Sequence, residues 1–343
     1  MNNYSLSNKY GNSQKIINNV LKKEETVMRN TFLKFVTLLA FGFSTLISGN
    51  ALAHDNKQYT IGFAAANLQA DFFNFIKESV EAETARLGHK SIVVDSGGDD
   101  AKQVSQIEDL LVKQIDALVL IISGNTDGNA QIRKAKEAGI PVITVDRNTT
   151  NPPGDSFIAS DSEVAAYEMG MWVAEKTGGK GVVGVIQGQL GSTPEIARDT
   201  GFENAIAQFP DLNTVEKQAS KMWSRDEGVS IAQDLLTRNP EITVLFGRCD
   251  ALAQGAAQAA KAMGRDDVLV VGFDGDRAAL QDLKNNNTLL AATMTQQTLT
   301  IGRNAVRFAI DAIEGRYIPS EMLYGSTLTT PENVDQFMGD GHP

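Results

Sequence analysis

The stretch YTIGFAAANLQADFFNFIKESVEAETARLG, residues 59–88, contains one complete unit of the fold that the sequence predicts. Its first part, YTIGFAA (59–65), is a short apolar run typical of a buried strand. A helical pattern follows in residues 72–88, where apolar side chains recur at three- and four-residue steps and Gly88 ends the pattern. The stretch therefore predicts a β-strand followed by an amphipathic helix.

The same alternation of apolar runs and helical patterns repeats along the chain, at intervals of about 25 to 30 residues. It is typical of βαβ units around a parallel sheet. The runs are nearly continuous, which indicates strands that helices cover on both faces. The predicted strands are residues 59–65, 90–96, 117–123, 141–147, 181–187, 213–220, 242–247, 268–274 and 289–295.

The composition allows two packed cores. The chain has 343 residues, of which 42% are hydrophobic and 21% charged, an ordinary balance for globular domains. The proline-dense loop 148–155 and the following SFIASD (156–161) are interpreted as a connector. We therefore expect the first change of domain near Asp161.

Charge and cysteine content exclude two classes of protein. The net charge of −11, with no basic stripe, offers nothing to a phosphate backbone, so we expect no nucleic-acid partner. Cys249 is the only cysteine, which excludes an intramolecular disulfide. The protein must therefore depend on packed cores.

The first 53 residues are predicted to lie outside the folded domains. Residues 28–53 have a basic start, a 12-residue apolar core (36–47) and an Ala-Leu-Ala ending, which together predict a secretory signal peptide cleaved after Ala53. Residues 1–27 are interpreted as a non-native extension upstream of the true start, with a long n-region as the alternative. No later run reaches the length of a membrane span.

Motifs for common chemistry are missing. The sequence has no phosphate-binding, dinucleotide-binding or serine-hydrolase loop. His54, His89 and His342 lie away from the predicted strand ends, and no Cys/His cluster has metal-ligand spacing. We therefore expect no catalytic residue, no metal and no cofactor.

Polar and aromatic side chains instead recur where the predicted strands end, which is where parallel sheets bind ligands. Carboxylates accept hydrogen bonds from vicinal hydroxyls, guanidinium groups donate to them, and the C–H faces of a sugar pack on aromatic rings. This mixture predicts a site for a small polyhydroxylated molecule. The candidate residues are Phe72, Phe73, Asp146, Arg147, Arg198, Trp223, Asp250, Phe273, Asp274 and Gln296.

Each candidate also has a purely structural interpretation. One of the two phenylalanines could be a core residue of its helix, and Asp146 with Arg147 could be a surface ion pair. Cys249, with no histidine nearby, is interpreted as a small, partly buried apolar residue. The recurrence at one end of successive strands favours the binding interpretation.

Six motifs then resemble one known family in order and spacing, from about Tyr59 to about Thr330. They are GFAAANLQADFFNFIKESVE, VITVDRN, FIASD, GSTPEIARDTGF, VLVVGFDGD and LLAATMTQQTLTIG. They resemble the ribose-binding type of periplasmic sugar-binding protein, the soluble receptors of ATP-driven importers, which are related to the ligand-binding domain of lactose-repressor-type regulators.

The resemblance implies an α/β fold of the type I periplasmic binding protein, with two doubly wound parallel-sheet lobes joined by a three-crossover hinge. It implies an N-terminal lobe of residues 54–161 plus 297–325 and a C-terminal lobe of residues 162–296 plus 326–343. The crossovers should fall near Asp161, near Gln296 and within 324–330.

The resemblance also implies roles for individual residues. From the first lobe, Phe72 and Phe73 would stack on the sugar, and Asp146 and Arg147 would hold its hydroxyls. The second lobe would contribute a further set. That set is Arg198, Trp223, Phe273, Asp274 and Gln296.

Two positions depart from the family pattern. Ala70 and Cys249 stand where the ribose binders have Asn, and each change removes a hydroxyl partner. This puts ribose in doubt and leaves another pentose, a hexose or a sugar alcohol open.

The resemblance implies a periplasmic protein that is not an enzyme and delivers its ligand to the permease of an ABC transporter in the inner membrane. We expect a monomer, with a chemoreceptor as an additional partner. The alternative cargo is a furanosyl signalling molecule such as autoinducer-2. A DNA-binding regulator would need a helix-turn-helix where the signal peptide stands. A sugar hydrolase could use Asp146 and Asp274, but a flanking arginine should keep them ionised.

Overall fold

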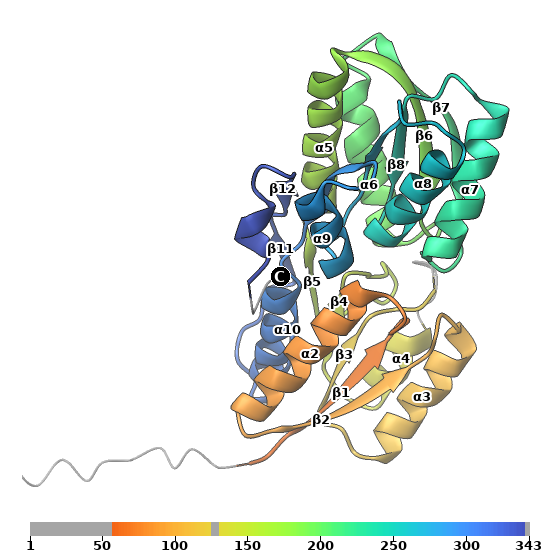
Figure 1. The fold of residues 1–343 in the computed structure, drawn as a ribbon. Helices are drawn as coiled ribbons and strands as arrows, with labels where there is room; N and C mark the ends of the chain where they lie inside the picture. The colour runs from red at the N-terminus through yellow and green to blue at the C-terminus, as the bar shows by residue number, and fades with distance from the viewer. Residues whose placement is uncertain (1–56, 125–129, 340–343) are drawn as a thin grey trace, which may run out of the picture. The chain divides into compact units, whose positions relative to one another are not determined.

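The parallel strands predicted from the sequence form two separate sheets. A computed structural model describes residues 57–124 and 130–339, and both sheets lie within the unit Gln58–Pro343 (Figure 1). The predicted signal peptide and the extension before it fall outside the described residues.

The first sheet has six strands in the order β11-β5-β4-β3-β1-β2, and each is parallel to its neighbours. The strands are β1 (Thr60–Ala65), β2 (Lys90–Asp95), β3 (Ala117–Leu120), β4 (Val142–Val145), β5 (Ser156–Ser160) and β11 (Glu321–Tyr324). The strand order reverses direction beside β1, so the ends of β1 and β3 open onto a crevice where ligands bind in such sheets.

The second sheet has six strands in the order β12-β10-β9-β8-β6-β7. Its strands are β6 (Lys180–Gln187), β7 (Asp211–Ala219), β8 (Val244–Gly247), β9 (Leu269–Val271), β10 (Leu290–Thr295) and β12 (Thr327–Thr329). The pairs are parallel except for β12, which runs antiparallel to β10. The two sheets thus repeat one architecture.

Helices cover both faces of each sheet. The helices of the first sheet are α2 (Asp71–Arg86), α3 (Asp100–Val112), α4 (Ala130–Glu137) and α10 (Thr298–Ile313). The helices of the second are α5 (Ser162–Thr177), α6 (Thr193–Ile206), α7 (Arg225–Arg238), α8 (Asp250–Ala262) and α9 (Arg277–Asn285), and a short 3₁₀ helix, η1 (Val334–Phe337), packs near α9.

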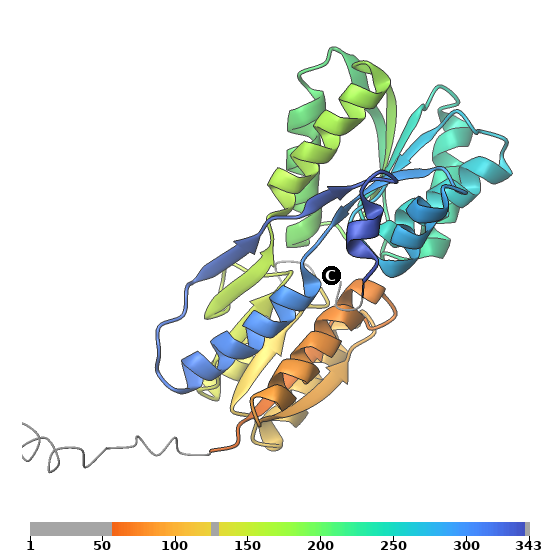
Figure 2. The ribbon, with the colours of Figure 1, turned by 60° about the vertical axis from the view of Figure 1, so that its left-hand side comes forward.

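Each face of each sheet has its own hydrophobic core. In the first sheet, α2 and α10 lie side by side over one face, where Phe63 packs (Figure 2), and α3 and α4 cover the other, where Leu118 packs. In the second sheet, α5 and α6 cover one face and α7, α8 and α9 the other. With both faces covered, only the strand ends remain to form a site.

The chain passes between the sheets at three places. It leaves β5 in the first sheet at Ser160 and enters α5 on the second, and it leaves β10 at Thr295 and enters α10 on the first. It then leaves β11 at Tyr324 and joins the second sheet as β12. These crossings coincide with the short segments in which the sequence placed the hinge.

One predicted connector is a strand. Residues 156–160 were expected to be part of a loop, but they form β5, which is buried throughout and pairs with β4 and β11. The prediction was wrong because this strand has only five residues and one of its partners comes from more than 150 residues later in the chain. The strands β11 and β12 were also missed.

Each of the nine predicted strands overlaps an observed strand; β6 and β7 begin before the predicted residues, and several others end earlier than expected. Residues 141–147 and 268–274 were predicted, whereas β4 ends at Val145 and β9 at Val271. Both predicted ranges included polar residues at which the backbone leaves the sheet. Asp146 has a φ of 62° and Asp274 has a φ of 134°.

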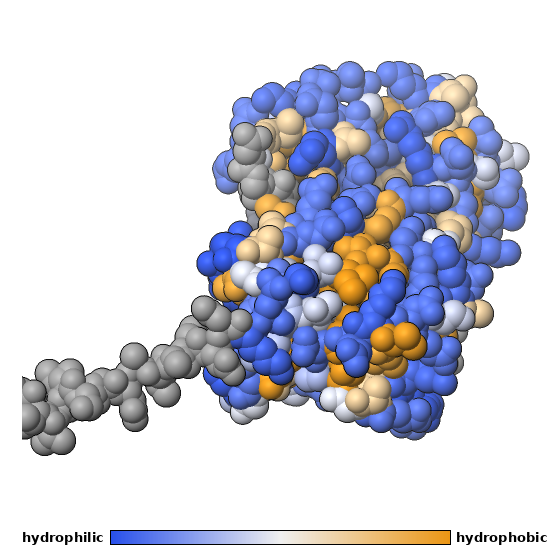
Figure 3. Space-filling view, turned by 90° about the horizontal axis from the view of Figure 1, so that it is seen from below, coloured by the Kyte–Doolittle hydropathy of each residue, from blue (hydrophilic) through white to orange (hydrophobic). Residues whose placement is uncertain are grey.

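Among the described residues, no helix has the length and apolar character needed to cross a membrane. Seen from below, the surface is mostly hydrophilic, with one band of apolar residues (Figure 3).

The close packing of α7 against α8 depends on a glycine. A side chain at Gly255 would collide with the backbone of Arg225 and Val229 on α7. We expect Gly255→Ala to lower the free energy of unfolding by ~1–3 kcal/mol, because the two helices must separate. Urea denaturation followed by circular dichroism measures this change. Gln258→Ala, on the exposed side of α8, is the control and should leave stability nearly unchanged.

Candidate functional site

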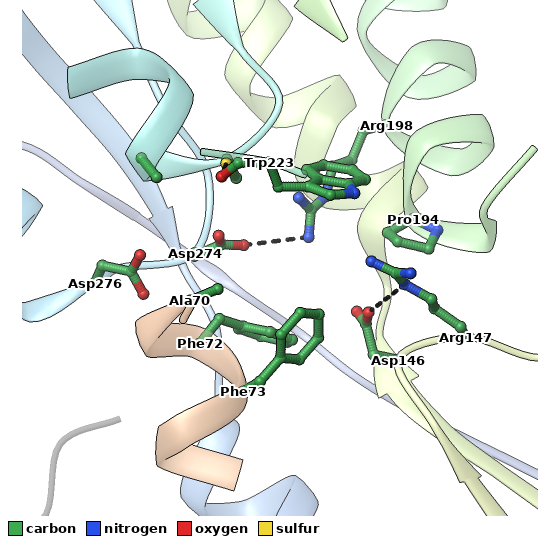
Figure 4. Close-up of a pocket in the computed structure, with 12 residues that line it drawn as sticks. Ala70, Phe72, Phe73, Asp146, Arg147, Pro194, Arg198, Trp223, Asp274 and Asp276 are labelled. Atoms are coloured by element: carbon green, nitrogen blue, oxygen red, sulfur yellow. Dashed lines mark hydrogen bonds and ion pairs between the residues drawn. The ribbon is translucent and has the colours of Figure 1, made fainter. Parts of the chain in front are cut away.

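A pocket lies where the carboxyl ends of the two sheets face each other (Figure 4). Segments that follow β1 and β4 of the first sheet and β6 to β9 of the second supply its walls. The lining residues are Ala70, Phe72, Phe73, Asp146, Arg147, Pro194, Arg198, Trp223, Cys249, Ala251, Asp274 and Asp276. Seven of the ten predicted site residues are among them.

Phe72 and Phe73 begin α2, which directly follows the loop after β1. Their rings meet edge to face with centroids 5.3 Å apart, an arrangement that aromatic quadrupoles favour. Both side chains are also part of the core beneath the pocket. Each ring therefore serves the core and the pocket wall at once.

Asp146 and Arg147 form a buried pair at the end of β4. The Arg147 Nε lies 3.6 Å from the Asp146 Oδ2. Both residues are buried, since Arg147 is 4% exposed and Asp146 is 7% exposed. The Arg147 Nη1 donates to the carbonyls of Ile122 and Ser123 and, at 3.1 Å, to the Oε1 of Gln189 in the second lobe. The interpretation as a surface ion pair is therefore wrong.

Arg198 occupies the matching position in the second lobe. Its Nη2 donates to the Asp274 Oδ1 at 3.3 Å, and its guanidinium stacks 3.9 Å from the centroid of the Phe273 ring. Gln296 donates from Nε2 to the same Asp274 oxygen at 2.6 Å. Phe273 and Gln296 thus lie behind the pocket wall and position the two charged groups that line it.

Trp223 lies between the two arginines. The guanidinium groups of Arg147 and Arg198 are 5.9 and 5.8 Å from its ring, within the range of cation–π attraction. The residue is 9% exposed, and its Nε1 has no partner among the described residues. An unpaired buried donor beside an open pocket is available to a ligand.

Three of the lining residues have a left-handed backbone, namely Asp146, Trp223 and Asp274. This conformation is unfavourable for residues with a Cβ and clusters at functional sites. It turns each side chain out of the direction that its strand or loop would otherwise give it. The strain therefore favours a binding role over a purely structural one.

Asp250 was predicted to hold a hydroxyl, but it does not line the pocket. Its Oδ2 accepts from the backbone N–H groups of Gly275 and Asp276, and its Oδ1 accepts from the Thr293 hydroxyl. These bonds fix the loop that carries Asp274. The structure thus places Asp250 as a support for the site.

Sequence reasoning missed a second supporting residue, Arg248. Its fully buried guanidinium donates to the carbonyl of Arg198 and to Asp199 Oδ1, and the Arg248 carbonyl accepts from Arg198 Nη1. It also lies 4.6 Å from the Phe246 ring. This exchange fixes the position of Arg198. Arg248 directly follows the predicted strand 242–247, so the strand-end pattern that selected the other polar residues could have indicated it.

Five lining residues were not among the predicted site residues: Ala70, Pro194, Cys249, Ala251 and Asp276. Cys249 was expected to be a partly buried apolar residue; it is 5% exposed and its Sγ accepts from the Leu252 N–H at the start of α8. Asp276 follows Asp274 by two positions in GFDGD, so the spacing of two acids in one loop could have indicated it.

Burial dominates the protonation of the pocket acids. It raises the pKa of Asp274 to about 8, against the lowering effect of Arg198. It also raises the pKa of Asp146, against Arg147, and that of Asp276, where repulsion from Asp274 adds to the shift. In both Asp146 and Asp274, burial thus outweighs the lowering effect that was expected of the flanking arginine. In residues 57–124 and 130–339, no group of His, Cys, Asp and Glu is arranged to hold a metal.

Residues 61–316 match the family model described as periplasmic binding protein domain. The chain belongs to this family. It is 32% identical over 264 residues to the ribose import binding protein RbsB of Bacillus subtilis. The alignment covers 77% of this chain and 85% of that protein. The resemblance to the ribose-binding type of periplasmic binding protein is thereby confirmed.

Two further relatives carry other ligand names. The xylitol-binding protein of Mycolicibacterium smegmatis is 28% identical and covers 77% of this chain and 76% of its own. A solved ABC transporter solute binding protein from Bacillus halodurans C-125, with bound myo-inositol, has a TM-score of 0.77 and 27% identity. It covers 83% of this chain and 99% of that chain. The predicted fold class is confirmed.

The position of Trp223 depends on Gly188. A methyl group at Gly188 would occupy the space of the indole ring. In a Trp172→Phe background, where Trp223 is the only tryptophan, we expect Gly188→Ala to shift the fluorescence emission to longer wavelength as the ring moves toward water. Gly325→Ala is the control, since a methyl there meets no atom. An unchanged emission maximum for Gly188→Ala would contradict this packing.

Asp276 should make the unliganded protein less stable as pH rises. Its pKa is raised in the folded state, so the folded protein binds more protons than the unfolded chain, and the free energy of unfolding falls between the two pKa values. We expect a smaller fall in melting temperature from about pH 5 to about pH 8 in Asp276→Asn than in the wild type. The exposed Asp266→Asn is the control. Identical profiles for wild type and Asp276→Asn would refute the assignment.

Proposed function

We propose that the protein captures a monosaccharide, pentose-like in size, or a sugar alcohol between its two lobes and delivers it to an ABC importer. The observation that carries this proposal is the composition of the pocket: guanidinium groups, carboxylates and aromatic rings, contributed by both lobes and buried together. The ligand-binding residues we propose are those that line it. They are Phe72, Phe73, Asp146, Arg147, Arg198, Trp223 and Asp274, with Phe273, Gln296 and Asp250 as supports.

The pocket chemistry suits a ring or chain of hydroxyl groups. The arginines donate charge-assisted hydrogen bonds to hydroxyl oxygens, and the aspartates accept from hydroxyl hydrogens. Phe72, Phe73 and Trp223 offer apolar surfaces for the C–H faces of the ligand. A buried site of this kind rejects compounds that lack one hydroxyl, because a polar group of the protein is then left unpaired.

Binding and delivery require that the ligand enter and leave between the lobes. Within residues 57–124 and 130–339, the chain passes between the sheets through short segments near residues 161, 296 and 325, and such segments can act as hinges. The bonds from Arg147 to Gln189 and from the Asn148 N–H to the Thr193 hydroxyl connect the lobes near the pocket. Opening would break these bonds, so ligand that strengthens them would favour closure.

The relatives reported above support a transport role in the periplasm. They are named for binding or import of ribose, xylitol and, in the solved structure, myo-inositol. A hydrolytic role gains no support from them, although the raised pKa of Asp274 would suit a general acid. The signal-carrier alternative likewise gains none, and the expected monomer and chemoreceptor partner stay predictions.

Arg147→Ala tests the proposed function. Without the guanidinium fork we expect at least a hundredfold loss of affinity for the best ligand in a panel of pentoses, hexoses and alditols, about 2.7 kcal/mol or more. Isothermal titration measures it, with Arg303→Ala, an exposed arginine on α10, as the control. Circular dichroism checks the fold, because Asp146 loses its partner.

Arg147→Lys provides a second variant that keeps a positive charge beside Asp146. It should fold and still bind weakly, because a lysine cannot make the forked contacts of an arginine. Unchanged affinity in both variants, or no binding of any polyhydroxylated compound by the wild type, would overturn the proposal.

A further inference from the structure

The two ends of the pocket differ in charge. Arg147 and Asp276 lie at opposite ends of the labelled side chains in Figure 4, with Asp274 between them. Arg147, Arg198 and Asp146 lie toward one end. At the other end Asp276 is the charged group, next to Ala70.

The other charged groups of the site have partners within the protein. Asp146 lies beside Arg147, and Asp274 accepts from Arg198 and Gln296. Asp250 is held by two backbone N–H groups and a hydroxyl. Asp276 is therefore the exception to be explained.

Asp276 is 8% exposed, and its carboxylate makes no hydrogen bond or ion pair with any residue in the described part of the chain. It stands at the N-cap of α9, yet it does not accept from the N–H groups of that helix. Its acidic surroundings include Asp274, Asp250 and Asp71 of the first lobe. A buried carboxylate without a partner is unfavourable and points to a missing one.

The neighbouring side chains cannot supply that partner. Ala70 has no polar side-chain atom. The Cys249 thiol already donates to the Trp223 carbonyl and accepts from the Leu252 N–H. Neither of these lining residues therefore pairs with Asp276, and a ligand in the pocket can supply the donor.

We propose that this end of the pocket receives a primary ammonium group, so that the preferred ligand is an amino sugar or an amino alditol. The inference rests on the proposed function and specifies its substrate class. Asp276 is then a specificity-determining residue that accepts a charge-assisted hydrogen bond from the ligand nitrogen.

An ammonium fits this end better than a hydroxyl for two reasons. It offers three N–H donors and a full positive charge, whereas a hydroxyl offers one donor and no charge. The buried acids Asp274 and Asp250 also act on Asp276, and an ammonium group favours the ionised form of each acid, which strengthens its attraction to this end. Arg147 and Arg198 repel an ammonium from the opposite end, which fixes the orientation of the ligand.

Matched pairs of compounds test this inference by isothermal titration. The pairs are glucamine with glucitol, 1-amino-1-deoxyribitol with ribitol, and glucosamine with glucose. We expect the amine of at least one pair to bind about tenfold or more tightly than its hydroxyl counterpart, a difference of about 1.4 kcal/mol.

Asp276→Asn, which keeps the shape of the side chain and removes its charge, should abolish that preference and change the affinity for the neutral compound less than about threefold. Asp71→Asn is the matched control. It removes a nearby acid that is exposed and does not line the pocket, so the preference should be kept.

The inference fails if every amine binds no better than its hydroxyl counterpart, or if Asp276→Asn keeps the preference. In either case binding of a neutral polyol that Arg147→Ala abolishes would leave the proposed function standing. If no compound of any pair binds the wild type, the proposed function fails and this inference fails with it.

Discussion

The burial of two arginine–aspartate pairs at facing sheet ends is the constraint on which the site depends. A charge leaves water at a cost of several kcal/mol, so each guanidinium needs partners that compensate for this cost. Arg147 obtains them from Asp146 and two carbonyls at the end of β3, and Arg198 from Asp274 and the Arg248 carbonyl. Both sets exist only if several parallel strands end at the same level. Because helices cover both faces of each sheet, the strand ends are where polar side chains can gather, and the two arginine–aspartate pairs lie there.

The loops around these pairs are held in conformations that a free chain would avoid. The left-handed backbone at Asp146, Trp223 and Asp274 is unfavourable by an order of 1 kcal/mol or more at each position. Asp250 secures one of these turns through the backbone N–H groups of Gly275 and Asp276. Residues that do not touch the pocket therefore determine where its carboxylates point.

Much of this organisation follows from sequence pattern, and the exceptions have physical reasons. Nine strands were predicted because buried parallel strands are continuous apolar runs. The strand β5 was not predicted because it is short and because it pairs with β11, a distant segment that a local sequence pattern cannot reveal. The charged pair after β4 was predictable as a strand ending, but its burial depends on Gln189 and on the carbonyls of Ile122 and Ser123 after β3, which only the fold brings near. Asp250 has the right residue type in the right place, yet its hydrogen bonds point away from the pocket.

Several buried polar atoms of the site residues make no hydrogen bond within the described part of the chain, among them the Nε of Arg198 and the Nε1 of Trp223. Folding alone does not favour this, because an unpaired buried donor raises the free energy of the native state by about 1–3 kcal/mol. Such groups are tolerated where a ligand satisfies them, and the ligand then regains that free energy as affinity and selectivity. The excess of carboxylates over guanidinium groups around Asp274 is likewise unfavourable in the empty protein, and a ligand that satisfies these carboxylates would offset it. We expect a pocket that is strained, incompletely hydrogen-bonded and acidic at one end to be less stable empty than filled, and under the proposed function this difference would couple binding to closure of the lobes.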